Sequence, residues 1–390
     1  MQTDSIFSRA IAFAIIVSAF FFNKVAVADT IVITRDGKEV SIQGERLQEA
    51  QDKSILFETT DGQLHVFAAS RIVSLEIEVE KPTPMTHEEV GESMLAELPV
   101  GFKILRTKHY VIAYQTELAY AKWIGDLYEK RLVPEFEKFA KKKLKYKLVP
   151  ASHPLTAIVF GSRPEYTRYV QRELGNDPGP PIAYYNQMTN RVAMFDLTFD
   201  FGRGVPGDPR RLDKVLSKPA AIPMVATIIH EGTHQLMYNR GMQTRFADGP
   251  VWLNEGMANW FEAPDLRNAK GWRRPGMMND LRLRQLKKYL PVRPADSLET
   301  LVSSDDRFSG EGVLDAYAES WALVHFLIRH RKVEFQRYIE ELSKKQPGFV
   351  VDPEERLKAF RKHFGDKNKK RLGDLAKLEK AFQNYMRSLK

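Results

Sequence analysis

The feature that most constrains this chain is the run HEGTH at residues 230–234. Histidines four residues apart lie on one face of a helix, one turn from each other, so both rings can reach a single ion. In this H-E-x-x-H arrangement two neutral imidazoles bind Zn²⁺ and the glutamate activates a water. Pro223 can occupy the first turn of such a helix. The sequence therefore predicts a helical zinc site with His230 and His234 as ligands and Glu231 as general base.

A second helix is predicted from the run WLNEGMAN at residues 252–259, which follows the turn signal DGP at residues 248–250. Glu255 faces inward on this helix, and a carboxylate buried among apolar residues needs a cation or a hydrogen-bonding partner. A catalytic zinc takes three protein ligands and leaves one position for water. We therefore expect Glu255 to be the third ligand. The alternative for this region is a solvated face of His and Glu side chains that binds no metal.

Residues 1–28 have the pattern of an export signal. Arg9 precedes an apolar run from Ala10 to Phe22, and the small residues 26–28 form a cleavage signal that ends at Ala28. The apolar run is too short to span a bilayer comfortably. We expect cleavage after Ala28, a secreted or periplasmic protein, and no stable membrane insertion after cleavage. A signal retained as an anchor is the alternative.

The chain has no cysteine, which excludes cysteine-protease chemistry, cysteine-containing zinc sites and a cysteine-linked lipid anchor. Its formal net charge is +9. The basic run over residues 141–147 is not interleaved with aromatic residues, and no nucleic-acid-binding motif accompanies it. We therefore expect no nucleic-acid partner. The sequence does not indicate the oligomeric state.

The length of 390 residues allows two or three domains. Residues 29–80 are predicted to form a small all-β, SH3-like domain, because hairpin signals at residues 36–37 and 61–62 are flanked by strand-forming residues. Residues 81–100, which begin with the run KPTP, are predicted to be a linker. Such a β domain can bind a surface or partner, or serve only as a structural appendage.

Residues 101–200 are predicted to be the α/β N-terminal part of the main domain, and residues 201–390 its helical, zinc-binding part. The α/β part is expected to contain strands at residues 102–114 and 155–160, helices at 117–141 and 164–174, and a hairpin at 183–195. Helices are expected in the last part at residues 281–289, 314–330, 333–344, 354–364 and 372–389. A strand before the metal-binding helix can be a sheet edge to which a peptide substrate adds.

Three segments together resemble the gluzincin metallopeptidases, the zincins whose third ligand is a glutamate on the following helix. They are HEGTHQ at residues 230–235, WLNEGMA at 252–258 in the form seen in the aminopeptidase-N type, and YAESWAL at 317–323, where that type has its catalytic tyrosine. Over residues 102–389 the chain resembles the peptidase-MA-like family of exported bacterial proteins. This resemblance implies an α+β fold with a zincin-like catalytic domain, Zn²⁺ as cofactor, and a peptide or protein as substrate.

Carried over residue by residue, the resemblance supports the three zinc ligands and the base already named, and it implies that Tyr317 stabilises the oxyanion. Asn259 stands four residues after Glu255, where a group often orients a ligand histidine. The Gly-x-Met-Glu-Asn element with which aminopeptidases of that type hold a free α-amine is not present in this sequence. Endopeptidase, aminopeptidase and amidase activities therefore all stay open.

Two further classes of function compete with a peptidase. One is a non-catalytic envelope protein that uses the zincin fold as a scaffold and residues 29–80 as its binding surface. The other is a zinc amidase that acts on non-protein amide bonds. The intact Glu231 argues against the first class, because a scaffold has no physical need of a base beside its metal.

Overall fold

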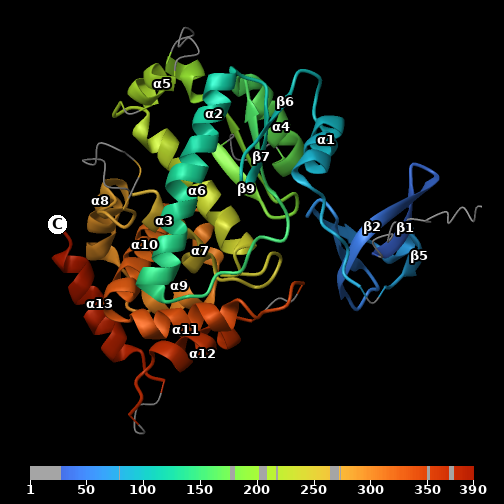
Figure 1. Cartoon of the computed structure of the whole chain (residues 1–390). Coiled ribbons are helices and arrows are strands. Elements are labelled where there is room, and N and C mark those ends of the chain that lie inside the picture. The colour runs from blue at the N-terminus through green and yellow to red at the C-terminus, as the bar shows by residue number, and fades with distance from the viewer. Residues whose placement is uncertain are drawn as a thin grey trace, which may run out of the picture.

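Two β-sheets and a large helical region follow one another along the chain (Figure 1). The structure is a computed structural model, and it describes residues 28–78, 80–175, 181–201, 209–216, 218–263, 272, 274–348, 352–368 and 373–390. The fold is α+β, with an all-β region first and a mainly helical part last, as the sequence predicts. The predicted export signal falls on residues 1–27, which lie outside the described residues, and on Ala28. Within the described part, no helix is both long enough and apolar enough to cross a membrane.

The N-terminal sheet has five antiparallel strands in the order β4-β3-β2-β1-β5. The strands are β1 (Asp29–Arg35), β2 (Lys38–Glu49), β3 (Ile55–Thr59), β4 (Leu64–Phe67) and β5 (Ile72–Glu76), with a 3₁₀ turn η1 (Ala69–Arg71) before the last. Asp36 and Gly37 both have positive φ, 51° and 72°, as the predicted two-residue hairpin turn requires. The sheet buries its own small core, made of Ile31, Ile33, Ile55, Phe57 and Phe67. The predicted N-terminal all-β region is therefore confirmed.

Residues 81–100, predicted as a linker, instead include helix α1 (His87–Glu97). Thr86 and Glu89 form a reciprocal capping box that starts the helix. Val90 and Met94 are buried in the core of the main domain, one turn apart on the same face. The connection between the two sheets is therefore short, and most of the predicted linker belongs to the main domain.

The second sheet is mixed, with the order β6-β7-β8-β10-β9. Its strands are β6 (Lys103–Arg106), β7 (Tyr110–Tyr114), β8 (Leu155–Phe160), β9 (Ala183–Asn186) and β10 (Arg191–Phe195). β7, β8 and β10 run parallel, whereas β6 and β9 are antiparallel edge strands. The single strand predicted at residues 102–114 is wrong, because the chain turns back between β6 and β7. The hairpin predicted at residues 183–195 is confirmed, and β9 is a sheet edge.

Helices cover this sheet. One continuous helical segment runs through α2 (Leu118–Leu127), η2 (Tyr128–Leu132), α3 (Val133–Lys138) and η3 (Phe139–Leu144), where η2 and η3 are π-helical turns. Helix α4 (Arg163–Leu174) begins at Ser162, whose side chain accepts a hydrogen bond from the Glu165 amide. A 3₁₀ turn η4 (Leu197–Phe201) follows β10. The predicted helices at residues 117–141 and 164–174 are confirmed, and the π turns are an additional finding.

The remaining described chain is almost entirely helical (Figure 1). Its helices are α5 (Pro209–Leu216), α6 (Ile222–Asn239), α7 (Val251–Phe261), α8 (Asp280–Tyr289), α9 (Ser297–Ser303), α10 (Val313–His330), α11 (Lys332–Leu342), α12 (Pro353–Phe364) and α13 (Ala376–Ser388), with 3₁₀ turns η5 (Leu290–Val292) and η6 (Asp306–Phe308). The helices that the sequence predicts in this part are present; α5 and α9 were not predicted.

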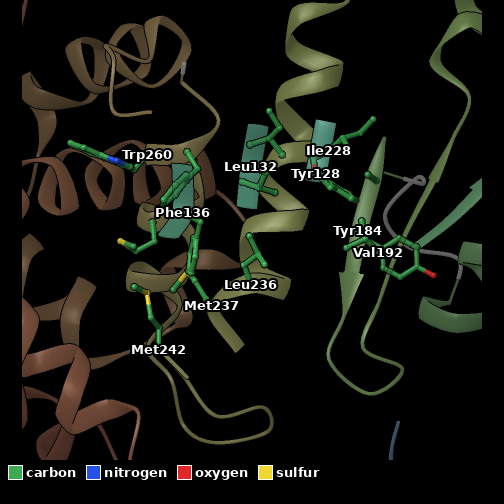
Figure 2. Packing of buried hydrophobic residues seen from close by; sticks show 14 of the residues in the cluster. Tyr128, Leu132, Phe136, Tyr184, Val192, Ile228, Leu236, Met237, Met242 and Trp260 are labelled. Carbon is green, nitrogen blue, oxygen red and sulfur yellow. The ribbon is translucent and has the colours of Figure 1, made fainter. Parts of the chain in front are cut away.

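The main core extends from α1 to α13, and one part of it lies where the long helical segment, α6 and the β9–β10 hairpin meet (Figure 2). Gly232, inside the HEGTH run, is needed for this contact, because a Cβ there would lie 2.7 Å from Leu132 and 2.8 Å from Tyr128. Gln235 fixes α6 to the sheet by donating to the backbone carbonyls of Thr156 (2.9 Å) and Asn190 (2.8 Å). Helix α6 is thus held on two sides, which fixes the direction of its polar side chains.

Candidate metal centre

Helices α6 and α7 supply the predicted ligands. Helix α6 carries His230 and His234 one turn apart, and α7 carries Glu255. Gly256 lets α7 lie close against α10, because a Cβ there would lie 2.6 Å from the Ser320 carbonyl oxygen. This close contact sets the rotation of α7, which turns Glu255 toward the two histidines.

The three side chains converge on one point. Glu255 Oε2 lies 3.0 Å from His230 Nε2, and Glu255 Oε1 lies 3.5 Å from His234 Nε2. One ligand atom from each residue can be chosen so that all three lie within 4.8 Å of one another. In a tetrahedral zinc site with ligand distances of about 2.0–2.2 Å, neighbouring ligand atoms are about 3.4 Å apart. The donor types and their separations therefore fit a metal ion, and the sequence prediction of these residues as one cluster is confirmed.

A residue that the sequence analysis missed, Glu262, holds the first histidine. Its Oε2 lies 2.7 Å from His230 Nδ1, on the side of the ring that faces away from Glu255. Asn279 donates to the other oxygen of Glu262 at 2.7 Å. A hydrogen bond at Nδ1 fixes the tautomer that leaves Nε2 as a metal donor. The spacing offered a signal, since Glu262 follows Glu255 by two helical turns on the same face.

Asn259 does not orient a ligand histidine, so that prediction is wrong. Its side-chain oxygen accepts a hydrogen bond from Arg282 Nε at 2.7 Å, and the carboxylate of Glu262 has the position beside His230. Arg282 Nε also lies 3.7 Å from Glu262 Oε1. Arg282 lies on α8, 20 residues after Glu262 in the sequence, and the packing of α8 against α10 brings it to the site.

Glu231 is separate from the three ligands and faces the sheet edge. Its Oε2 accepts a hydrogen bond from the backbone N–H of Tyr185 in β9 at 2.8 Å. Burial raises the pKa of Glu231 to about 7, and the negative charge of Glu255 adds to that rise. A carboxylate poised near neutral pH can both accept and return a proton. A cation bound beside it would shift its pKa down again.

The two histidines differ in their protonation without a metal. Burial opposes a charge on both rings. For His230, hydrogen bonds to Glu255 and Glu262 outweigh burial and raise its pKa well above the ordinary value. For His234, burial dominates and lowers the pKa to about 4, so this ring is neutral and ready to bind a metal. A metal ion at His230 would therefore compete with a proton on that ring.

Tyr317 lies on α10 with its ring against Arg282, whose guanidinium carbon is 5.0 Å from the ring centroid. Phe308 packs edge-on against the same ring, with the centroids 5.6 Å apart. Burial raises the pKa of Tyr317, and the Glu255 carboxylate raises it further. The hydroxyl therefore keeps its proton at neutral pH and can donate a hydrogen bond. Arg282 also lies beside Glu262, with its Nε 3.7 Å from Glu262 Oε1, so the ring of Tyr317 borders the residues around His230. The catalytic role of Tyr317 stays a prediction.

Comparison with known proteins matches the part of the chain that holds the site to a family, without naming an activity. A family model described as "Protein of unknown function (DUF1570)" matches residues 224–349. This segment is less than half of the chain, and it contains all the predicted site residues together with Glu262 and Arg282. No curated protein is significantly similar to the chain.

Proposed function

We propose that this chain is an exported, zinc-dependent metallopeptidase of the gluzincin type. The observation that carries the proposal is the convergence of His230, His234 and Glu255, with Glu231 beside them in contact with the edge strand β9. The donor set of two imidazoles and one carboxylate is typical of catalytic zinc, which keeps one position open. The nearby base would have no purpose in a purely structural site.

His230, His234 and Glu255 would hold the zinc, with Glu262 fixing the first ring. Zinc bound there would lower the pKa of a water to about 7 and polarise a substrate carbonyl. Glu231 takes the proton from the attacking water and returns it to the leaving amine.

Tyr317 stabilises the negative charge that develops on the substrate carbonyl oxygen. Its protonated hydroxyl donates a hydrogen bond to that oxygen, and a donor placed in this way is worth about 10²–10³ in rate. Arg282 lies against the ring and restricts its movement. The positive charge of Arg282 also stabilises the negative charge that develops on the substrate carbonyl oxygen.

Strand β9 is the proposed binding site for the substrate backbone. It is an edge strand, and its Tyr185 amide already contacts Glu231, so a peptide added along this edge lies next to the base. The arrangement of a mixed sheet with an edge strand beside the HEGTH helix supports a zincin-like fold. The strand order of the N-terminal sheet and its 3₁₀ turn before β5 likewise support an SH3-like domain.

Cleavage mapping tests this function. A pool of denatured proteins is incubated with zinc-loaded native protein and with Glu231→Gln, and new termini are identified by mass spectrometry. We expect cleavage by the native protein and a loss of about 10²–10⁴ in rate for the variant, the size of general acid–base catalysis. Equal rates for the two proteins would contradict the mechanism, and hydrolysis of only non-peptide amides would move the proposal to the amidase class.

A further inference from the structure

The outward edge of β9 offers only a short site for an added strand. In an antiparallel pair, alternate residues turn both backbone groups to the same side. Tyr185 turns away from β10, because its N–H donates to Glu231. Ala183, two residues before it in β9, therefore faces outward as well, and Gln187 follows β9 in the hairpin turn. Within the described part of the chain, this leaves the backbone groups of Ala183 and the carbonyl of Tyr185 for a substrate.

The next outward group, at Gln187, is already occupied. Its carbonyl oxygen accepts a hydrogen bond from Arg245 Nη1 at 3.1 Å. The Gln187 side chain also accepts one from the Phe246 amide at 3.2 Å. Arg245 and Phe246 belong to the connection between α6 and α7, so this connection closes the edge beyond Asn186.

The N-terminal β domain docks at the same place. The Leu64 amide in β4 donates to the Met188 carbonyl at 2.7 Å, in the turn of the β9–β10 hairpin. Arg245 Nη1 also donates to the Gly62 carbonyl at 2.9 Å, and its Nη2 pairs with Glu58 of β3. Figure 1 shows the small domain beside the part of the main domain that carries β9. Arg245 therefore ties three parts of the chain together at the end of the free edge.

We propose that the N-terminal β domain and Arg245 form an end-stop, which blocks a substrate strand added to β9 from extending beyond Asn186. This block restricts cleavage to bonds near one end of a peptide. This inference rests on the proposed peptidase function. At a rise of about 3.3 Å per residue, β9 continues for only about 3 Å beyond Tyr185 before the turn that holds Gln187. No more than about three substrate residues fit between the position facing Glu231 and the stop.

The direction of the added strand decides which end of the peptide is restricted. An antiparallel pairing is slightly more stable per residue than a parallel one. An antiparallel substrate on β9 has its N-terminal side toward Asn186 and the end-stop. The protein therefore removes one to about three residues from the N-terminus of its substrates, without the amine-binding element of the aminopeptidase-N type.

The test is a length series of peptides with one scissile bond, zinc-loaded native protein, and products identified by mass spectrometry. We expect kcat/KM to fall on the order of tenfold or more when the segment before the bond grows beyond about three residues, and to be insensitive to extension after it. Cleavage deep inside long peptides at an undiminished rate would overturn the end-stop while leaving the peptidase function intact. An absence of all peptide cleavage by zinc-loaded protein would overturn both.

Arg245→Ala provides the second arm of the test. Loss of this charged hydrogen-bonding group should release the β9–β10 hairpin from the N-terminal β domain. The dependence of kcat/KM on peptide length should then weaken on the order of tenfold. Arg240→Ala is the matched control, because Arg240 also pairs with a carboxylate (Glu137, 2.9 Å) and a backbone carbonyl, but on another face. If Arg245→Ala does not fold, Glu58→Gln removes the charge on the partner side. Unchanged discrimination in the folded variant would overturn the role of Arg245.

Discussion

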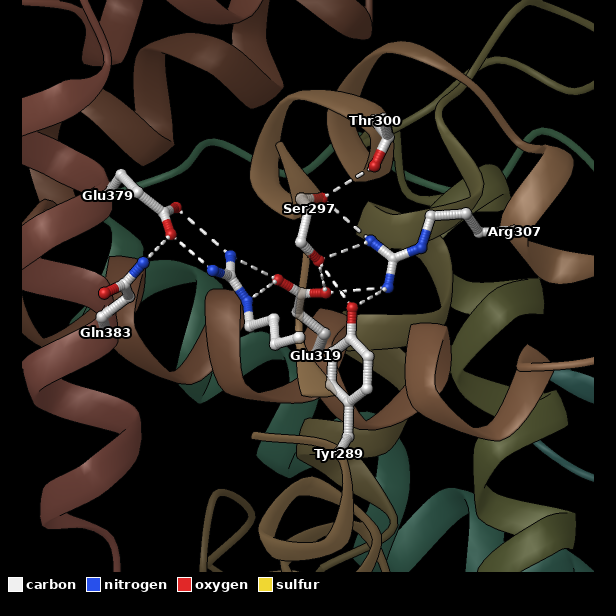
Figure 3. Close-up of polar contacts among 8 residues, drawn as sticks. Tyr289, Ser297, Thr300, Arg307, Glu319, Glu379 and Gln383 are labelled. Atoms are coloured by element: carbon white, nitrogen blue, oxygen red, sulfur yellow. Dashed lines mark hydrogen bonds and ion pairs between the residues drawn. The ribbon is translucent and has the colours of Figure 1, made fainter. Parts of the chain in front are cut away.

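Two clusters of buried carboxylates in this molecule are satisfied in different ways. Around Glu319, which is fully buried, two guanidinium groups and a hydroxyl supply every partner (Figure 3). Arg293 donates to it at 2.8 Å, Arg307 at 2.9 Å and Ser297 at 2.6 Å. Arg293 also pairs with Glu379, so two carboxylates face two guanidiniums. This cluster is neutral without any added ion.

The cluster at the metal centre lacks this balance. Among the described residues in contact there, the carboxylates of Glu231, Glu255 and Glu262 face a single guanidinium, that of Arg282, and two imidazoles. Without a metal, a positive charge on His230 and a proton on Glu231 offset this excess of negative charge. When both imidazoles are neutral, as metal ligands must be, three negative charges against one leave a net charge of −2. One dication would bring the cluster to neutrality. The Glu319 cluster therefore needs no ion, whereas the cluster at the candidate metal centre could take a dication in place of the proton on His230.

The largest effect on stability is expected from Glu319→Ala. Removing this carboxylate leaves two guanidiniums buried and unpaired, which costs about 3–5 kcal/mol of unfolding free energy. Zinc content of the folded protein should not change. Denaturant unfolding with metal analysis measures both. Glu299→Ala is the control, because the Glu299–Arg361 pair is exposed and should contribute less than about 1 kcal/mol. Loss of zinc in Glu319→Ala would show that the two clusters are not independent.

Much of the metal centre could be predicted from the sequence, because helical periodicity alone places His230 and His234 together, and Glu255 follows as a buried carboxylate. Arg282 and the Glu319 cluster could not be predicted in the same way. Their partners come from helices far apart in the chain, and only tertiary packing brings them together. Helical periodicity places Glu262 on the same face as Glu255, but it does not show whether Glu262 contacts the ring of His230 or that of His234.

Strands and helices were predicted correctly where the sequence has clear apolar runs and turn signals, and they were missed where these signals are weak. The hairpin at residues 183–195 and the strand at 155–160 have clear apolar runs and turn signals. The turn between β6 and β7 was missed, because residues 107–109 contain no glycine, proline, asparagine or aspartate to signal a turn. Helix α1 was missed because it buries few apolar residues and follows a proline-rich stretch. The π turns η2 and η3 depend on local hydrogen bonding that composition does not reveal.

The next largest effect is expected from Tyr317→Phe. Loss of the hydroxyl should lower kcat about 10²–10³-fold, or about 2.7–4 kcal/mol, with zinc content and stability retained. Tyr289→Phe is the matched control from the other cluster, where the hydroxyl contacts Ser297 and Arg307. That variant should lose about 1 kcal/mol of stability and keep its kcat. A native kcat in Tyr317→Phe would remove the tyrosine from the mechanism.

Zinc should stabilise the native chain by about 2.7 kcal/mol at a free concentration one hundred times Kd. Thermal unfolding with added zinc and with a chelator measures this difference. Glu255→Ala should lose the difference, because one of the three ligands is gone. Tyr289→Phe should keep it in full. A zinc-dependent shift of native size in Glu255→Ala would contradict the ligand assignment.

The smallest effect is expected from Glu262→Gln, which keeps the shape of the side chain and removes its charge beside His230. Zinc affinity should fall about 10–100-fold, or about 1.4–2.7 kcal/mol, as for other groups that orient a ligand histidine. Competition with a chromophoric chelator gives the two affinities. Asn259→Ala should bind zinc with near-native affinity, because Asn259 contacts Arg282 instead of the histidine. The opposite ranking of these two variants would restore the role first predicted for Asn259.

The central claim is that His230, His234 and Glu255 hold one zinc ion. Anomalous X-ray diffraction at the zinc absorption edge, on crystals of the zinc-saturated chain, tests it most directly. We expect one strong anomalous peak per chain, located between Nε2 of His230, Nε2 of His234 and the carboxylate of Glu255. A zinc-saturated chain with no peak between these three side chains, or with its strongest peak elsewhere, would contradict it.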